Sequence, residues 1–382
     1  MKFKTEKLGQ YLYIKGRIGW KGLKKNEYLN EGEYRIINGE SLSSNGIDWN
    51  KAGYITEERY EESPEIKLQE NDILISKDGT IGKIGFVKKL SKPSTVASGI
   101  FVIRNNNKEQ IDTRFIYHYL RSPYFRNFIK ARTEGSVIPH LYQKDFVELD
   151  FPLCSLLEQK KISSILDAID EKIQVNKDIN DNLLQQASTI YKAWFEDFTP
   201  FDGICPAGWK QGTLSDIADI TSGRRPPMKS AEKTDIAIIP LVGAASVMGF
   251  TSESNHTDKI LVTGRVGTHG VVQRFNTPCW TSDNTLVITS DFYEYTYQIL
   301  QQIDYPAMNR GSTQPLITQG DMNKVAIIIP DRQTLDNFET LVGQLMLQYE
   351  TNLLENTKLA DLRDALLPRL MSGELDVSDM AL

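Results

Sequence analysis

A stretch of twelve residues occurs twice in this chain, and the duplication limits the possible folds more than any other feature. It reads GSVIPHLYQKDF at residues 135–146 and GSTQPLITQGDM at residues 311–322, so the two copies begin 176 positions apart. In each half it follows three other matching motifs in the same order: a Gly-Arg pair, a β-branched run with a G-x-x-G-x-x-G loop, and a second β-branched run. Four matches in register predict a duplicated structural unit.

A heptad pattern follows each copy of this Gly-Ser element. Positions alternating by four and three residues are mostly apolar from Ile162 to Trp194, and the pattern recurs from Phe338 to Leu370. An apolar period of about 3.5 residues over several heptads is typical of a coiled-coil seam. The sequence therefore predicts two long helices, each starting soon after a copy of the repeated element.

Both predicted seams are interrupted near their middle by a pair of asparagines. If the helices run antiparallel, Asn176 and Asn180 meet Asn352 and Asn356. Polar residues at seam positions weaken the packing but fix the register of the two helices. Two separate amphipathic helices, each packed on its own domain, are the alternative that the pattern leaves open.

These patterns predict an α+β protein with an internal pseudo-two-fold duplication. Two globular domains of mixed strands and short helices would be joined by two long helices that form an antiparallel coiled coil. A helix of about 40 residues spans on the order of 60 Å, so the pair would act as a spacer. The expected boundaries are residues 1–153 for the first globular domain, 154–198 for the first long helix, 199–208 for a linker, 209–331 for the second globular domain, 332–373 for the second long helix and 374–382 for a C-terminal tail.

The net charge of −6 is unevenly distributed along the chain. Residues 1–150 carry 25 Lys and Arg against 20 Asp and Glu, whereas residues 331–382 carry 4 against 10. Because the acidity is concentrated in predicted helical segments, the overall charge does not exclude a nucleic-acid binder.

The sequence favours a cytoplasmic protein. Its first residues have no apolar core of signal-peptide length, and no run approaches the ~20 apolar residues of a membrane span. Three cysteines, Cys154, Cys205 and Cys279, are scattered and form no CxxC pair. This spacing argues against a disulfide framework and against a zinc site. We expect no membrane contact and no metal site.

Catalytic motifs are missing from the sequence. It has no GxxxxGK(S/T) phosphate loop, no HExxH metal motif and no GxSxG nucleophile elbow. The only Pro-Pro pair lies in RRPPM and does not fit the Asn/Asp-Pro-Pro-aromatic loop of adenine methyltransferases. We therefore expect that the chain performs no catalysis alone and holds no cofactor of its own.

The glycine loops and the polar side chains around them are the candidate nucleic-acid contacts. Glycine lets backbone N–H groups approach phosphates, Lys and Arg neutralise charge, and Arg or Gln can pair with base edges. Tight turns between core strands and solvated surface arginines are the alternatives. The candidates are Arg17, Lys77, Thr80, Lys83, Arg132, Ser136, Tyr142 and Lys144 in the first half, and Arg224, Arg225, Arg265, Thr268, His269, Arg310, Ser312, Thr313 and Gln314 in the second.

The two halves share their framework residues but differ in the side chains between them. The duplication aligns Gly16-Arg17 with Gly223-Arg224. Within the Gly-Ser elements, Val and Ile at positions 137–138 correspond to Thr and Gln at positions 313–314. One scaffold with different reading residues would recognise two different DNA sequences.

Three further stretches resemble the specificity (S) subunits of type I restriction-modification systems. They are STIYKAWFEDFTPF at residues 188–201, PAGWKQGTLSDIADITSGRRP at residues 206–226 and LLPRLMSGELDV at residues 366–377. Together with the Gly-Ser elements, the resemblance covers nearly the whole chain. It is weakest in the N-terminal region of the first globular domain.

The resemblance implies two target-recognition domains, each reading one half of an asymmetric bipartite site on double-stranded DNA. The long helices would set the length of the unread spacer and dock two methyltransferase (M) subunits. The M subunits would bind S-adenosylmethionine and flip out adenine. Restriction and translocase (R) subunits, with ATP and Mg²⁺, would join for cleavage. A stand-alone tandem DNA-binding regulator and a coiled-coil scaffold without DNA contact are the other functions open at this point.

Overall fold

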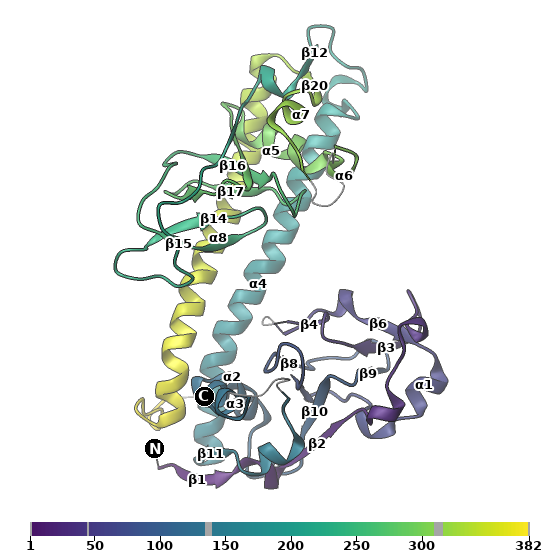
Figure 1. Ribbon diagram of the computed structural model, residues 1–382, viewed down its shortest axis with the longest axis vertical. Coiled ribbons are helices and arrows are strands. Elements are labelled where there is room, and N and C mark those ends of the chain that lie inside the picture. Colours follow the sequence, from purple (N-terminus) through teal and green to yellow (C-terminus); the bar gives the residue numbers. More distant parts are fainter. Residues whose placement is uncertain (1, 44–45, 134–139, 309–315, 381–382) are drawn as a thin grey trace. The chain divides into compact units, whose positions relative to one another are not determined.

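The computed structural model describes residues 2–43, 46–133, 140–308 and 316–380 (Figure 1). The chain forms two compact units. Unit 1 contains Met1–Val175 and Glu355–Leu382, and unit 2 contains Asn176–Leu354. This division passes through both long helices, so each unit contains one globular head and a part of each helix. The serial domain boundaries expected from the sequence stay a prediction.

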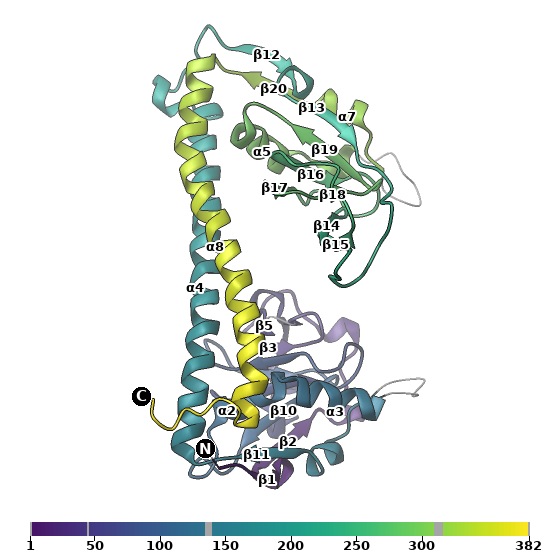
Figure 2. The same cartoon turned by 90° about the vertical axis from the view of Figure 1, so that its left-hand side faces the viewer.

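The two long helices are α4, Leu156–Phe195, and α8, Arg332–Ser372 (Figures 1 and 2). In unit 1 they run antiparallel: Lys161 near the start of α4 donates to the carbonyl of Ser378, 2.6 Å away and just beyond α8. Further along α4, Lys172 pairs with Glu355 at 3.2 Å. The α+β class with a long antiparallel helix pair is thereby confirmed.

In unit 2 the helix pair contains the predicted asparagine contact. Asn352 donates its side-chain N–H to the amide oxygen of Asn180 at 2.8 Å, and Asn180 donates to the carbonyl of Tyr349 at 3.2 Å. Asn176 is also buried, and Asn356, which belongs to unit 1, is half-buried. That these side chains fix the register of the helices remains a prediction.

The first head is built from three main sheets that pack against short helices. Their strand orders are β1-β11, β2-β10-β7-β8 and β6-β3-β9, and a small hairpin is formed by β4-β5. The elements are β1 Lys4–Lys7, β2 Leu12–Gly16, β3 Tyr34–Ile37, β4 Leu42–Ser43, β5 Gly46–Ile47, β6 Gly53–Ile55, α1 Glu57–Glu61, β7 Ile73–Ser76, β8 Ile84–Phe86, β9 Ser94–Val96, β10 Ile100–Asn105, α2 Thr113–Arg121, α3 Pro123–Thr133 and β11 Asp150–Leu153.

The second head repeats this topology strand for strand (Figure 2). Its sheets have the orders β12-β20, β13-β19-β16-β17 and β15-β14-β18, which match the three main sheets of the first head one to one. The elements are β12 Lys210–Thr213, β13 Asp219–Ser222, β14 Ile239–Val242, β15 Val247–Thr251, β16 Ile260–Gly264, β17 Gln273–Phe275, β18 Trp280–Thr281, β19 Thr285–Thr289, α5 Tyr293–Gln302, α6 Tyr305–Met308, α7 Gln319–Asn323 and β20 Ala326–Ile329.

Each head shares its main hydrophobic core with the long helices of its own unit. In unit 1, Ile162 and Leu166 of α4 and Leu370 of α8 pack in the same cluster as Phe115 of α2. Full burial of such a side chain contributes roughly 1.5–3 kcal/mol, so the helices contribute strongly to the stability of the head. Among the described residues, no helix is both long enough and apolar enough to cross a membrane.

In unit 2 the shared core is rich in aromatic side chains. The ring of Phe338 in α8 lies 5.0 Å from that of Phe195 in α4 and 6.2 Å from that of Tyr295 in α5, measured between centroids. Both contacts are edge-to-face, the geometry that aromatic pairs prefer. The hydroxyl of Tyr295 also donates to the carbonyl of Ile328 in β20.

Candidate DNA-recognition surface

In each head the Gly-Arg pair and the glycine loop lie at one end of the four-stranded sheet. Strands β2 and β7 both pair antiparallel with β10, so both end where β10 begins. Strands β13 and β16 have the same relation to β19 in the second head. We call this region the loop end of each sheet. It brings the Gly-Arg pair and the glycine loop together, although they are far apart in the sequence.

The glycine loop of the first head connects β7 to β8 as a tight turn. Gly79 and Gly82 have φ angles of 63° and 85°, a region that strongly favours glycine. The hydroxyl of Ser76 donates to the carbonyl of Thr80 at 2.6 Å and accepts from the N–H of Lys83 at 2.9 Å. The loop is therefore fixed from inside, and Thr80 is exposed on it.

The glycine loop of the second head connects β16 to β17 in the same way. Gly267 and Gly270 have φ angles of 86° and 82°. The ring nitrogen Nδ1 of His269 lies 3.1 Å from the carbonyl oxygen of Gly264, so this side chain supports the turn. Thr268 is exposed, while His269 is half-buried.

Two backbone hydrogen bonds show which residues of the loops correspond. In the first head, Lys77 donates its N–H to the carbonyl of Gly99 at 2.9 Å and accepts from Leu141 at 2.9 Å. In the second, Arg265 donates to the carbonyl of Asn284 at 2.8 Å and accepts from Ile317 at 3.0 Å. Lys77 and Arg265 therefore occupy equivalent positions. Leu141 and Ile317, the seventh residues of the two Gly-Ser elements, therefore lie directly against the glycine loops.

Several candidates of the first head already have partners within the protein. Lys77 lies with its Nζ 4.9 Å from the centroid of the Phe101 ring, and burial lowers its pKa. Lys83 donates its Nζ hydrogens to the carbonyl of Gly39 at 3.0 Å. Arg132 forms an ion pair with Glu148 at 2.7 Å.

Three candidates of the first head are freely presented, and others lie outside the described residues. Thr80, Tyr142 and Lys144 are exposed, with 54% of the Tyr142 surface accessible. The Nζ of Lys144 lies 5.4 Å from the centroid of the Tyr142 ring. The candidates outside the described residues are Ser136, Arg310, Ser312, Thr313 and Gln314, and so are positions 137–138.

In the second head, Arg224 and Arg225 are exposed and Arg265 is half-buried. The backbone of Arg224 is well anchored, because its N–H donates to the carbonyl of Thr281 at 2.9 Å and its own carbonyl accepts from the Trp280 ring N–H at 2.8 Å. Its guanidinium can therefore project from a fixed backbone position.

Arg17 contradicts the sequence prediction of an exposed guanidinium. Its side chain is only 2% exposed, with Nε donating to the carbonyl of Val96 at 3.2 Å and Nη1 donating to the hydroxyl of Ser63 at 3.4 Å. Burial lowers its pKa, and the neighbouring Arg59 adds to this effect. Arg17 supports the head from inside and does not present its side chain to a ligand.

The reason is a difference of one residue in strand register. Gly16 pairs with Phe101, whereas the residue that pairs with Leu286 in the second head is Ser222. Ser76, the last residue of β7, pairs with Ile100, and Phe101 is the next residue. Gly264, the last residue of β16, pairs with Thr285, and Leu286 is the next residue, so Phe101 and Leu286 are equivalent. The structural counterpart of Arg17 is therefore Gly223 and not Arg224.

Successive side chains of a strand point to opposite faces, so this shift explains the different fates of the two arginines. A Cβ added to Gly223 would lie 2.1 Å from the carbonyl oxygen of Ser282 and 2.7 Å from that of Thr281. Arg17 fills the matching position in the first head, whereas Arg224 is one residue further along the chain and reaches solvent.

The comparisons with known proteins agree with this duplicated architecture. Residues 3–185 and 206–360 match the family described as the type I restriction modification DNA specificity domain. The chain belongs to this family. It is a family of non-catalytic DNA-recognition subunits, and the expectation of a specificity subunit is confirmed.

Two curated relatives match over most of their length. The MjaIX specificity subunit of a type I restriction enzyme from Methanocaldococcus jannaschii is 28% identical over 356 residues, which cover 82% of this chain and 81% of that protein. The HindI specificity subunit from Haemophilus influenzae is 22% identical, with 73% and 81% covered. The crystal structure of a type I S subunit from M. genitalium has the same fold, with a TM-score of 0.60 at 18% identity over 99% of this chain and 97% of that one.

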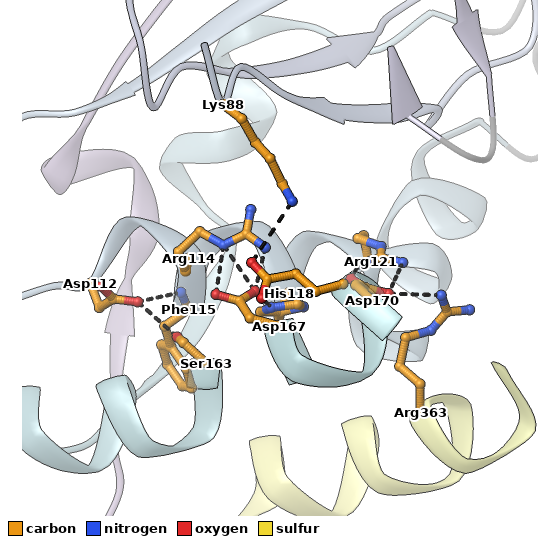
Figure 3. A network of polar contacts seen from close by, with 11 residues as sticks. Lys88, Asp112, Arg114, Phe115, His118, Arg121, Ser163, Asp167, Asp170 and Arg363 are labelled. Carbon is orange, nitrogen blue, oxygen red and sulfur yellow. Dashed lines mark hydrogen bonds and ion pairs between the residues drawn. The ribbon is translucent and has the colours of Figure 1, made fainter. Parts of the chain in front are cut away.

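In this family member, an ionic network attaches the first head to the long helices of unit 1 (Figure 3). Arg114 and His118 of α2 both contact Asp167 of α4, with 2.9 Å from Arg114 Nε and 2.6 Å from His118 Nε2. Burial raises the pKa of Asp167, but hydrogen bonds from His118 and Arg114 outweigh this effect and lower it to about 2. Arg363 of α8 joins the network through Asp170 at 3.0 Å.

A second network attaches the head of unit 2 to α8. Arg274 of β17 bonds to Glu294 of α5 at 2.6 Å and to Glu350 of α8 at 3.0 Å. Glu339 of α8 accepts the backbone N–H groups of Glu294 and Tyr295 at 3.0 and 2.8 Å, at the start of α5. Burial raises the pKa of Glu339 to about 7 against the effect of these two N–H donors.

Sequence reasoning missed one side chain of the loop end in the second head. Gln273 donates its side-chain N–H to the carbonyl of Gly243 at 2.8 Å, much as Lys83 donates to that of Gly39 in the first head. No sequence pattern indicated these two contacts, because the turns that contain Gly243 and Gly39 have different sequences. In the described parts of the chain, no cluster of His, Cys, Asp and Glu could hold a metal ion.

Proposed function

We propose that this specificity subunit reads an asymmetric bipartite site on double-stranded DNA, with one half-site for each head. The observation that carries the proposal is the repeated loop end: equivalent backbone hydrogen bonds hold Lys77 beside Leu141 and Arg265 beside Ile317, at the same position of the two Gly-Ser elements. A shared scaffold with different exposed side chains suits two heads that read different sequences.

The exposed side chains at the loop ends are the proposed DNA contacts. In the first head these are Thr80, Tyr142 and Lys144, with Lys77 and Lys83 at the base of the loop. The second head offers Arg224 and Arg225, which are exposed, with Arg265, Thr268 and His269 on the glycine loop. Arg side chains can neutralise phosphates or pair with guanine. Arg132, Ser136, Ser312, Thr313 and Gln314, and Arg310 just before the second Gly-Ser element, complete the proposed set.

The chain is proposed to act in a larger complex. The relatives are subunits of type I restriction enzymes, which supports M subunits carrying S-adenosylmethionine and R subunits using ATP and Mg²⁺ as partners. We assign two M subunits to the complex, one for each half of the duplicated chain. The long helices α4 and α8 would set the spacer between the half-sites, and the complex would work in the cytoplasm.

Co-expression with the M subunit, followed by methylome sequencing, tests the proposal. The expected result is one bipartite motif with methylated adenine in each half. Arg224→Ala and Arg225→Ala should change the sequence that is methylated at the half-site of the second head and leave the other half-site unchanged. Lys210→Ala in β12, where the side chain is also exposed, is the matched control. A continuous motif, or no motif at all, would contradict the proposal.

A further inference from the structure

The turn between β14 and β15 in the second head presents two adjacent apolar side chains to solvent. Val247 and Met248 are 45% and 37% exposed. The turn and the start of β15, residues 243–248, read GAASVM, so Ser246 is the one side chain there that can form a conventional hydrogen bond. Neighbouring exposed apolar side chains lower solubility and often mark a contact surface.

This turn is fastened to the loop end of its sheet. Gln273 at the start of β17 donates to the carbonyl of Gly243 at 2.8 Å, and Ser282 donates its N–H to the carbonyl of Val242 at 3.0 Å. A Cβ added to Gly264, the last residue before the glycine loop, would lie 3.0 Å from the Cβ of Ala244. The turn is therefore a neighbour of the glycine loop.

The side chain of Met248 lies over the backbone of its own turn. A Cβ added to Gly243 would lie 2.8 Å from the Met248 sulfur. Val247, in turn, pairs with Val242 across the hairpin. Val247 and Met248 are successive residues of β15, so their side chains point to opposite faces of the strand, and Met248 is the one that lies over the hydrogen-bonded turn.

Cationic groups are anchored to the same short stretch of chain. The backbone N–H of Arg224 donates to the carbonyl of Thr281, and that of Arg265 donates to Asn284. Ser282, which binds the turn, lies between these two acceptors. Exposed arginine and exposed apolar groups therefore share one small region, as expected for a surface that meets phosphates at its rim and base edges inside it.

The corresponding region of the first head is polar. After β3 the chain continues as NGESLS at residues 38–43, and a Cβ added to Gly85 would touch Leu42 and Ile47, which point inward. The heads thus share the position of this segment but differ in its chemistry.

We propose that Met248 reads the 5-methyl group of a thymine in the half-site of the second head. The thymine methyl is the apolar group that a base pair presents in the major groove, and apolar side chains are its usual partners. This inference rests on the proposed function, because it requires the second head to bind DNA. It adds a chemical identity to one position of the half-site.

Deoxyuridine provides the test, because it differs from thymidine in duplex DNA by the absent methyl group. The full complex with its M subunit is given duplexes in which each thymine of the second half-site is replaced in turn, except the one opposite the modified adenine. We expect one replacement to lower the methylation rate about four- to tenfold, the effect of one buried methyl group. Replacements in the first half-site serve as the control.

Variants connect this effect to Met248. Met248→Ala should reduce the ratio of rates between the thymine and uracil duplexes toward one, whereas Val247→Ala, on the opposite face of β15, should leave it unchanged. Ile204→Ala, an equally apolar side chain that is 71% exposed in the linker after α4, should leave the ratio unchanged.

Four results would overturn the inference. Equal rates on all thymine and uracil duplexes, or a second half-site without thymine, would refute it while the bipartite motif keeps the proposed function intact. A Met248→Ala variant that weakens association with the M subunit but leaves the ratio unchanged would identify the surface as a protein contact. A chain that directs no bipartite methylation would refute the proposed function and this inference together.

Discussion

At the scale of single residues, Arg17 and Arg224 show that the same dipeptide can do opposite things in two related heads. Aligned by sequence, Gly16-Arg17 and Gly223-Arg224 look equivalent. The strand register of Gly16-Arg17 differs by one residue from that of Gly223-Arg224, so the side chain of Arg17 points into the protein. Sequence comparison could identify the motif but not its register, because register is set by pairing with β10 and β19, which lie far along the chain.

We expect Arg17→Ala and Arg224→Ala to separate stability from DNA binding. Loss of the buried Arg17 hydrogen bonds should lower the free energy of unfolding by about 1–3 kcal/mol. Arg224→Ala should change it by less than about 0.5 kcal/mol, since exposed side chains contribute little. If Arg224 contacts a phosphate, its loss should reduce the salt dependence of DNA binding by about one unit of slope. Urea unfolding and binding titrations at several salt concentrations measure both effects.

Gly223 supplies a steric test of the same register. Gly223→Ala should destabilise the second head by roughly 1–3 kcal/mol, because the new Cβ would collide with the Ser282 carbonyl. Gly343→Ala in α8 is the matched control, because a Cβ there meets nothing within 4 Å. That variant should stabilise the protein by roughly 0.5–1 kcal/mol through helix propensity. Equal thermal shifts in the two variants would contradict the register.

At the scale of elements, the heptad pattern predicted two long helices, which the structure contains as α4, Leu156–Phe195, and α8, Arg332–Ser372. Long periodic segments carry their own signal. The three-stranded sheets of β3 and β14 could not be predicted in detail, because their strands have only two to five residues and distant partners.

The helix that starts beside the long helix in each head is capped differently. In unit 1, Asp112 caps α2 through the N–H of Phe115, and Ser163 of α4 donates to Asp112. In unit 2 the position 176 residues after Ser163 is Glu339, which caps α5 directly.

Glu339 should make the stability of unit 2 depend on pH. Its pKa of about 7 in the folded protein lies above the ordinary value of 4.5. The contribution of Glu339 to the free energy of unfolding is therefore fully present below its ordinary pKa and is lost as the pH rises through about 7. We expect the free energy of unfolding to fall by up to about 3 kcal/mol between about pH 5 and pH 8. In Glu339→Gln this dependence should be weaker, and an unchanged pH profile in urea unfolding would refute the assignment.

Removing one asparagine of the Asn180–Asn352 pair should destabilise the protein, whereas replacing both should not. Asn352→Ala leaves the buried Asn180 amide without its donor and should cost about 1–3 kcal/mol. The double variant Asn180→Leu and Asn352→Leu should be close to neutral or stabilising, because both polar groups are removed together. Unfolding of Asn180→Leu, Asn352→Leu and the double Leu variant forms a thermodynamic cycle. Strict additivity in that cycle would argue against a direct contact.

At the scale of the whole molecule, the duplication was visible in the sequence because glycine and serine framework residues recur. The matching strand orders of the two heads were not visible in the sequence, since most of the corresponding strands differ in their residues. The exposed side chains of the loop ends differ between the heads for the same reason: the fold constrains only the residues that shape its turns.

The length of the long helices should determine the spacer between the half-sites. Inserting seven residues after Val175 and after Leu354 keeps the heptad pattern and lengthens each helix by about 10 Å. At 3.4 Å per base pair, the spacer in the methylated motif should grow by about three base pairs. Methylome sequencing should show unchanged half-sites. A change within a half-site, with the spacer constant, would refute the proposed role of the helices.

The contacts that hold α5 have an evolutionary consequence. Glu339 binds two main-chain N–H groups, and the hydroxyl of Tyr295 binds the main-chain carbonyl of Ile328. Every amino acid except proline offers such an N–H, and every one offers the carbonyl. Residue 328 can therefore mutate without losing the carbonyl that Tyr295 binds, whereas Tyr295 needs its hydroxyl and Glu294 its carboxylate, which pairs with Arg274. The exposed side chains of the loop end take no part in these contacts, so a lineage can change them without changing the contacts that hold α5.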